Sequence, residues 1–228
     1  MLSYDSQKSK TLRFLAGHTS MLTILSIIIL IFSVVLHELA HGYMADSLGD
    51  PTARLQGRLT LNPLKHLDPV GSVIVPLITA LFGFTFGWAK PVPYNPYNLP
   101  DRRKGELLIA AAGPATNLFI ALIFGTILRL SAGYLSTSMA APAFAAFVTV
   151  VSYVVIINIV LALFNLIPLP PLDGSKILFS ILPGRFFRVR LILEAYAPIF
   201  VLLVVFFLWQ VLAPVIPWAF KLFTGLNF

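Results

Sequence analysis

The stretch that decides the fold spans residues 21–49 and reads MLTILSIIILIFSVVLHELAHGYMADSLG. Its first part, 21–36, is apolar except for Thr23, Ser26 and Ser33, and it contains neither a charge nor a proline. Such a run predicts a membrane-spanning helix, which needs roughly 20 apolar residues. The motif HELAH follows without a helix-breaking residue, so its polar side chains interrupt a segment suited to the bilayer.

The motif places two histidines, His37 and His41, four residues apart. On an α-helix they share one face, one turn apart, so both imidazoles can bind a single ion. Glu38 lies beside the first histidine, where its carboxylate can take a proton from a water on the metal. This pattern on a helix is typical of zinc-dependent peptide hydrolysis. A polar helix end without metal is the alternative, but ionisable groups at membrane depth are costly and favour a function.

Composition separates the chain from soluble proteins. Of its 228 residues, 58% are hydrophobic and 11% are charged, and the mean hydropathy is +0.89. These values predict a multi-span membrane protein. Because cysteine is absent, a metal must be bound by His, Asp, Glu, Asn or water. The net charge of +7 resides largely in loops beside apolar spans, which favours a lipid bilayer over nucleic acid as the partner.

Several apolar segments are candidates for membrane insertion. Four are long enough to cross a bilayer, at about 20–47, 106–130, 144–167 and 192–213. A fifth, 70–86, is shorter and contains Pro76, so we expect a re-entrant or half-inserted helix. The sequence therefore predicts an all-α polytopic membrane protein. Its expected parts are a polar N-terminal tail at 1–19, a core at 20–190, and a C-terminal span with an interfacial tail at 191–228.

The distribution of Lys and Arg bears on orientation. Three expected loops are basic, namely 48–69, 87–105 and 168–191. If 70–86 does not cross the membrane, these loops share one side, which the positive-inside rule makes cytoplasmic. The basic tail then lies outside, against the rule. If 70–86 crosses, the tail moves inside but the first basic loop moves outside. We prefer the first arrangement.

Two loop stretches have strand-like patterns. Residues 53–61 partly alternate polar and apolar side chains, and residues 88–94 are kept extended by Pro91 and Pro93. The prolines remove the N–H donors from one edge of 88–94 and leave the other edge able to pair. We therefore expect a small β-hairpin or edge strand.

A third metal ligand is expected, because a catalytic zinc usually has three protein ligands. Asp173 directly follows an apolar span and the Pro-rich stretch 165–172, and Gly174 permits a turn there. It is the candidate ligand; capping of the following helix is the alternative. His66 and Asp68 lie in a turn-rich stretch. They could cap the next helix or form hydrogen bonds in the shell of residues around the metal ligands.

Three motifs together resemble the site-2 protease family of intramembrane zinc metalloproteases. They are HELAH at 37–41, GPATN at 113–117 and NLIPLPPLDG at 165–174. Their order and placement match that family across about residues 20–190. The chain resembles the short bacterial branch, which lacks an inserted PDZ domain. The stretches NPLKHLDPVGS and FGWAKPVP are also similar to that branch.

The resemblance implies a set of roles. His37, His41 and Asp173 would bind one zinc ion, Glu38 would act as the general base, and Asn165 would bind the substrate backbone or the oxyanion. The three-helix catalytic core would consist of 20–47, 106–130 and 144–167. The first and third helices would end on the cytoplasmic side of a bacterial cytoplasmic (inner) membrane. Substrates would be single-span membrane proteins or signal-peptide remnants.

Some expectations go beyond the resemblance. An edge strand at 88–94, through Trp88, Val92 and Tyr94, could bind an unwound substrate by β-addition; a hairpin that plugs the cavity is the alternative. Asn117 could support the metal site or form only an interhelical bond, as expected for Asn158. A transporter or ion-handling protein using intramembrane His and Asp is the alternative function. The sequence indicates neither the substrate's identity nor the oligomeric state.

Overall fold

Three long helices form the framework of the protein. The computed structural model describes residues 2–81, 87–138, 142–197, 200 and 209–227. In these residues, the helices long and apolar enough to cross a membrane lie in α1 (Leu2–Ser47), α4 (Arg102–Ser138) and α5 (Pro142–Asn165). Their apolar stretches are Met21–Ser47, Arg102–Ser131 and Pro142–Asn165. The expected all-α polytopic architecture is confirmed.

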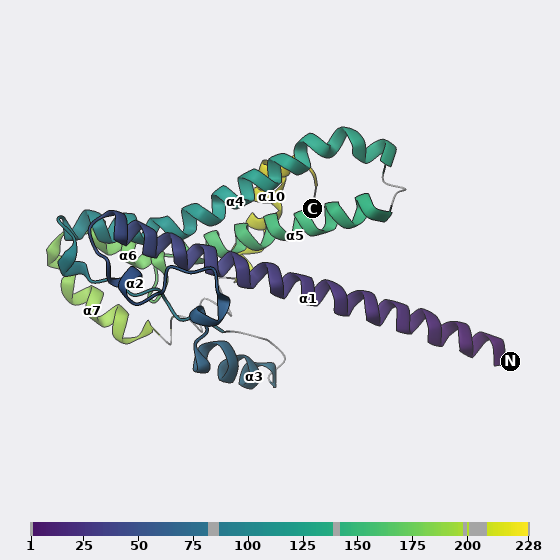
Figure 1. Ribbon diagram of the computed structural model, residues 1–228, viewed down its shortest axis with the longest axis horizontal. Coiled ribbons are helices and arrows are strands. Elements are labelled where there is room, and N and C mark those ends of the chain that lie inside the picture. The colour runs from purple at the N-terminus through teal and green to yellow at the C-terminus, as the bar shows by residue number, and fades with distance from the viewer. Residues whose placement is uncertain (1, 82–86, 139–141, 198–199, 201–208, 228) are drawn as a thin grey trace.

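The helices pack around α4, which contacts both α1 and α5. The C-terminal end of α1, the N-terminal end of α4 and the C-terminal end of α5 meet at the same end of the molecule, at the left of Figure 1. α4 is therefore antiparallel to both α1 and α5, as the expected core requires. α1 is continuous from Leu2, so the described part of the expected polar tail, 2–19, belongs to this helix.

The sides of α1 have the polarity expected in a bilayer. Ile24, Ile28 and Phe32 are exposed on its surface, whereas Ser33 and His37 are buried against the neighbouring helices. Lipid solvates apolar side chains but cannot bond polar ones, so a membrane helix keeps its polar groups inside the bundle. The packing therefore places the motif residues in the protein interior.

A second contact layer involves the C-terminal helix α10 (Val215–Thr224), which covers α4 and α5. Phe220 is buried there beside Leu128 and Ile159. Gly125 permits the approach, because a Cβ at this position would lie 2.9 Å from the Cβ of Phe223. Residues 198–199 and 201–208 of the expected span 192–213 lie outside the described residues, which include α7 (Phe187–Ala195) and α9 (Trp209–Leu212) in this region.

The described residues contain no β-strand, which corrects the predicted hairpin. Within 53–61, the chain forms part of the short helix α2 (Thr52–Leu55) and then turns at Gly57, whose φ is +62°. The stretch 88–94 is irregular. Its N–H donors are used, but they bind the Gly71 and His66 carbonyls, which lie in short helices, and the Glu38 side chain, so no ladder forms.

The segment 70–86 is described in part. Asp68 caps a short π-helix, η2 (Pro69–Ile74), by accepting hydrogen bonds from the N–H groups of Val70 and Gly71. The helix α3 (Val75–Ala80) continues from it, and residues 82–86 lie outside the described part. Six residues in each helix are fewer than a bilayer crossing needs.

Asp50 anchors the loop that approaches the metal-site end of α1. It is fully buried, and it accepts hydrogen bonds from the Asn95 N–H at 2.6 Å and the Asn98 amide at 2.7 Å. Its other partner is Thr52, through both N–H and hydroxyl. Burial alone would raise the pKa of Asp50, but these hydrogen bonds outweigh it and lower the pKa below its ordinary value.

Replacement of this carboxylate tests the anchor. In Asp50→Ala the half-buried N–H of Asn95 and the exposed amide of Asn98 lose their charged acceptor, and a hydrogen bond to a charged group contributes about 1.5–3 kcal/mol. We expect the midpoint of thermal unfolding in detergent to fall by roughly 4–8 °C. Glu194→Ala, which removes an exposed i,i+4 pair with Arg190, serves as control and should change little. Equal shifts for the two variants would contradict the anchoring role.

The same carboxylate gives a pH dependence with a defined sign. Because the pKa of Asp50 is lowered in the folded state, its stabilisation is fully present above the ordinary pKa of about 3.9 and declines as the pH falls towards the folded-state pKa. The difference in unfolding midpoint between the unmodified protein and Asp50→Ala should therefore shrink on acidification below about pH 4.

Candidate metal centre

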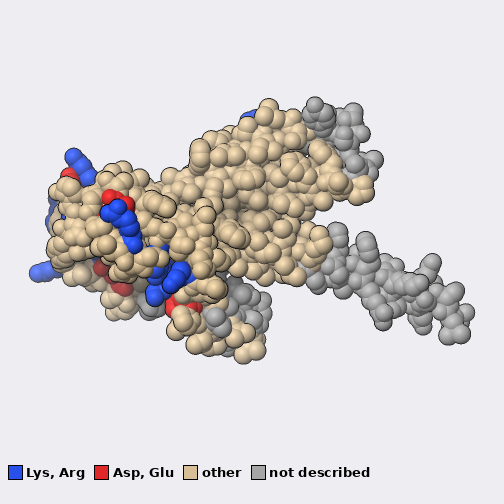
Figure 2. All heavy atoms as spheres, viewed as in Figure 1, with Lys and Arg blue, Asp and Glu red and all other residues tan. Residues whose placement is uncertain are grey.

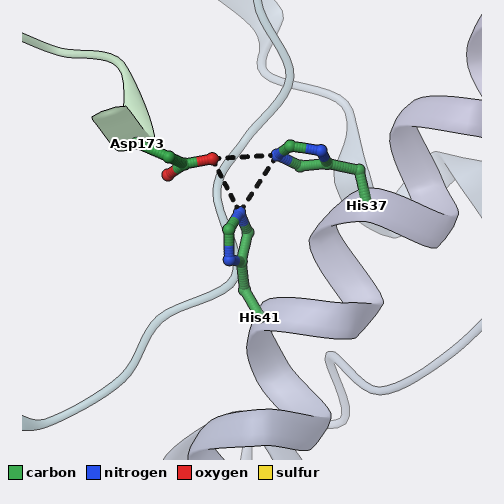
Figure 3. A group of neighbouring side chains, drawn as sticks. All are labelled: His37, His41 and Asp173. Atoms are coloured by element: carbon green, nitrogen blue, oxygen red, sulfur yellow. Dashed lines mark hydrogen bonds and ion pairs between the residues drawn. The ribbon is translucent and has the colours of Figure 1, made fainter. Parts of the chain in front are cut away.

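Three side chains from distant parts of the chain converge at one point (Figure 3). His37 and His41 project from consecutive turns of α1, and Asp173 begins α6 (Asp173–Ile181). The Asp173 Oδ2 atom lies 3.1 Å from the Nε2 atom of each histidine, and the two Nε2 atoms lie 3.0 Å apart. All three side chains are buried, with residue exposures of 5%, 8% and 6%.

The chain that follows α5 brings Asp173 to this point. α5 ends at Asn165, and the Pro-rich stretch 166–172 leads irregularly into α6. Gly174 lies directly against the carbonyls of Leu166 and Ile167, where a Cβ would not fit. The N-cap of α6 is Leu172, which makes no side-chain capping bond. The Asp173 side chain is therefore directed to the histidines, not used as the helix cap.

The donor set fits zinc. Two imidazole nitrogens and one carboxylate oxygen form a three-ligand set that leaves one position open for water or substrate. Ligands at ~2.0–2.1 Å from a tetrahedral ion lie about 3.3 Å apart, close to the 3.0–3.1 Å seen here. Gly113 of α4 forms the wall, because a Cβ there would lie 2.5 Å from both Nε2 atoms.

Helix α4 also supplies the outer partners of both histidines. The Nδ1 atom of His37 lies 2.6 Å from the Asn117 side-chain oxygen, and the Nδ1 atom of His41 lies 2.6 Å from the Ile109 carbonyl. Because both partners are acceptors, each Nδ1 donates its proton and each Nε2 keeps a lone pair for a metal. Sequence analysis identified Asn117 but missed Ile109, since a backbone acceptor leaves no trace in residue type.

Glu38 lies beside the cluster and is bound by a loop. Its Oε2 atom accepts a hydrogen bond from the backbone N–H of Val92 at 2.8 Å, and Val92 is buried. The loops approach α1 closely because Gly42 lacks a side chain: a Cβ there would lie 2.5 Å from Leu59 and 2.8 Å from Val92. The structure thus brings together the motif glutamate and the predicted substrate-binding residue Val92.

The other two residues expected in the 88–94 strand contact the protein itself. The Trp88 indole N–H donates to Asp68 at 2.7 Å, and its ring lies against Gly71. Tyr94 packs beside Leu99, and burial raises the pKa of its hydroxyl. Neither side chain reaches the cluster through these contacts.

The remaining predicted residues also have local partners. The Asn165 side chain donates to the Leu161 carbonyl of its own helix at 2.9 Å. His66 is buried and pairs with the Thr60 carbonyl at 2.9 Å. Asp68 caps η2. These contacts order the surroundings of the site without touching its three donor atoms.

Arg58 is a positioning residue that sequence reasoning missed. It is buried, and its guanidinium donates to the carbonyls of Lys90 at 2.9 Å and Pro91 at 3.2 Å. It therefore holds the stretch whose next residue, Val92, binds Glu38. In the sequence, a basic residue in a basic loop is typical of a solvated orientation signal, so no pattern distinguished it.

The fold and the buried cluster indicate a multi-pass membrane protein in which His37, His41 and Asp173 form a candidate metal site. The chain belongs to peptidase family M50, which it matches over residues 25–209. This membership confirms the resemblance to the site-2 protease family.

Individual relatives agree with this family. The chain is 43% identical over 171 residues to the candidate zinc metalloprotease YwhC of Bacillus subtilis (strain 168), covering 75% of this chain and 74% of that protein. It is 34% identical over 145 residues to the candidate zinc metalloprotease Rip2 of Mycolicibacterium smegmatis, covering 63% of this chain and 52% of that protein. Rip2 of Mycobacterium tuberculosis is 29% identical over 143 residues. No solved structure matches the chain.

The space beside Gly113 can be tested directly. In Gly113→Ala the added methyl group occupies the region next to both Nε2 atoms, so we expect the zinc content of the purified protein to fall from about one ion per chain to well below half. Gly184→Ala is the matched control, because a Cβ there meets nothing within 4 Å. Metal analysis of both variants decides the matter; full zinc occupancy in Gly113→Ala would contradict the geometry.

Proposed function

We propose that this zinc metalloprotease hydrolyses peptide bonds within membrane-spanning substrates at the cluster of His37, His41 and Asp173. The observation that carries the proposal is the convergence of three buried donor atoms within 3.1 Å of one another inside a membrane bundle. The motif glutamate lies next to the first of them. Peptidase family membership supports the reaction type.

Each residue of the site has a proposed task. The two histidines and Asp173 would hold one zinc ion, which when bound would supply Lewis-acid polarisation of the substrate carbonyl and a water with a pKa of about 7. Glu38 accepts the proton of that water and passes it to the leaving nitrogen of the substrate. Its position directly after His37 on the same helix keeps the base near the metal without making it a ligand.

The contact between Glu38 and Val92 gives substrate binding a role in activation. A transmembrane substrate must be locally unwound to expose a peptide bond, and an extended segment needs main-chain partners. We propose that a backbone carbonyl of the substrate accepts the hydrogen bond from the Val92 N–H in place of Glu38. The Glu38 carboxylate then becomes available for proton transfer. Trp88 and Tyr94 would flank this position, and their observed contacts keep the stretch 88–94 in place.

Asn165 is proposed to bind the substrate backbone or the developing oxyanion. Its side chain donates within its own helix in this structure, so this role requires rotation of the side chain towards the metal. Asn165 is the last residue of α5, where the following chain departs from helical geometry. Loss of an oxyanion donor typically lowers turnover by about 10²–10³-fold.

The distribution of charge supports an orientation. Lys and Arg side chains gather mainly over the end of the molecule that carries α2, α6 and α7 (Figure 2), the same end at which the metal-site helices meet. Cytoplasmic loops of membrane proteins are enriched in these residues. We propose that the protein resides in the bacterial cytoplasmic membrane and that its site opens towards the cytoplasm.

The general base is tested by Glu38→Gln. We expect this variant to lose cleavage of single-span substrates in proteoliposomes by at least about 10²-fold, because an amide cannot accept the proton. Zinc content should remain near one ion per chain, since the ligands are unchanged. Cleavage by the variant at the rate of the unmodified protein would refute the role of Glu38. Zinc-dependent flux that persists in Glu38→Gln without any cleavage would favour a transporter instead.

The third ligand is tested by Asp173→Ala. Removal of the carboxylate leaves two imidazoles, which should bind zinc far more weakly, so both zinc content and cleavage are expected to be lost. Lys176→Ala is a suitable control, because Lys176 contacts the same carboxylate only at 3.5 Å and is half exposed. Undiminished zinc binding in Asp173→Ala would show that the cluster does not hold the metal.

A further inference from the structure

A buried polar cluster lies in the membrane bundle behind the metal site. It consists of Ser33 on α1, Asn117 on α4 and Asn158 on α5, with exposures of 4%, 0% and 0%. Its surroundings are apolar, and Val155 and Ile159 beside it are fully buried. Polar side chains at such a depth are costly unless they are hydrogen-bonded. The cluster therefore has to be explained by what its bonds accomplish.

The hydrogen bonds form a directed chain. The Asn117 amide nitrogen donates to the Asn158 side-chain oxygen at 2.8 Å, while the Asn117 oxygen faces His37 Nδ1 at 2.6 Å. The Asn158 nitrogen donates to the Val154 carbonyl at 2.9 Å and to the Ser33 hydroxyl oxygen at 3.0 Å. No polar atom of either amide lacks a partner. This series of hydrogen bonds thus begins at Asn158 on α5 and ends at His37, a proposed metal ligand.

The direction of this chain is fixed at Asn158. If its amide were reversed, its oxygen would face the Val154 carbonyl, and two acceptors would oppose each other in an apolar interior. The same argument then applies to Asn117, because a reversed amide would set its oxygen against the oxygen of Asn158. Asn117 must therefore present its oxygen to His37.

The orientation of Asn117 selects the tautomer of His37. An oxygen at 2.6 Å requires a proton on Nδ1, which leaves the Nε2 lone pair facing Asp173 and the proposed ion. An amide nitrogen in its place would favour a proton on Nε2, and that tautomer cannot bind a metal there. The orientation of the Asn158 amide, transmitted through Asn117, therefore decides whether His37 can bind a metal through Nε2.

We propose that Asn158, supported by Ser33, is a positioning residue for the metal centre that acts on His37 through Asn117. This inference rests on the proposed metal site. Asn158 touches neither substrate nor metal; its contribution is to hold one amide in one of its two orientations. The geometry also explains why three helices, each from a different part of the chain, contribute a polar group at the same depth.

The test compares two replacements of Asn158 in the full-length purified protein. Asn158→Leu keeps a similar branched shape but removes the acceptor for Asn117. We expect the zinc dissociation constant of this variant to rise about tenfold, at the lower end of the range for residues that support metal ligands. Asn158→Asp keeps an oxygen acceptor, so this variant should bind zinc more tightly than Asn158→Leu. For thermal stability of the metal-free protein the order should be reversed, because a buried carboxyl group is costlier than a leucine.

Competition with a chelating dye gives the dissociation constants, and the visible spectrum of the Co²⁺-loaded protein reports the ligand geometry. Val155→Ala is the matched control: it lies on the same helix, is fully buried and apolar, and should lower stability without changing zinc affinity or the Co²⁺ spectrum. If Asn158→Leu and Asn158→Asp both bind zinc as tightly as the unmodified protein, the inference is overturned. Failure of the unmodified protein to bind zinc would instead overturn the proposed function.

Discussion

The structure depends on holding one carboxylate between two imidazoles inside an apolar bundle. An isolated carboxylate at membrane depth is strongly unfavourable, so Asp173 is tolerable there only with partners. Its oxygen lies 3.1 Å from two histidine nitrogens that come from a helix 132 and 136 residues earlier in the chain. The requirement to satisfy this group fixes where α6 begins and how the end of α5 meets α1. A metal ion bound there would supply the partner that this carboxylate needs, because both Nε2 atoms present lone pairs to it and no protons.

The packing of helix α4 against α1 is shaped by the same group of side chains. Helix α4 approaches α1 at a glycine because nothing larger than hydrogen fits beside the two Nε2 atoms. Four residues before and after Gly113, the same helix supplies the Ile109 carbonyl and the Asn117 oxygen. This periodicity places a void and two acceptors on one face of α4. Small residues usually serve close packing in membranes; here the close approach also sets the protonation pattern of both ligands.

The sequence predicted three of the apolar spans and the three residues whose donor atoms converge, because both depend on strong local signals. Long apolar runs have few soluble interpretations, and HELAH on a helix restricts where two imidazoles can point. The loops were predicted poorly for a physical reason. The pattern at 88–94 identified correctly which edge keeps its N–H donors, since those of Trp88, Lys90 and Val92 are all used. It could not reveal that their acceptors are the carbonyls of two short helices and the Glu38 carboxylate. Such partners are set by the tertiary path of the chain, so a strand was expected where an irregular segment forms.

Two contacts around the site differ in what turnover demands of them. The bond from Val92 engages one oxygen of the carboxylate that accepts the proton, and under the proposed function the substrate backbone replaces Glu38 as the partner of this N–H in every catalytic cycle. It joins α1 to a loop, and a loop can move without disturbing helix packing. The bonds from Asn158 through Asn117 to His37 must instead persist, because a reversed amide would place a proton on the metal-facing nitrogen. They connect three helices in the most buried part of the bundle, where rearrangement would break several bonds at once. The fold thus places the exchangeable contact on a loop and the permanent one between helices.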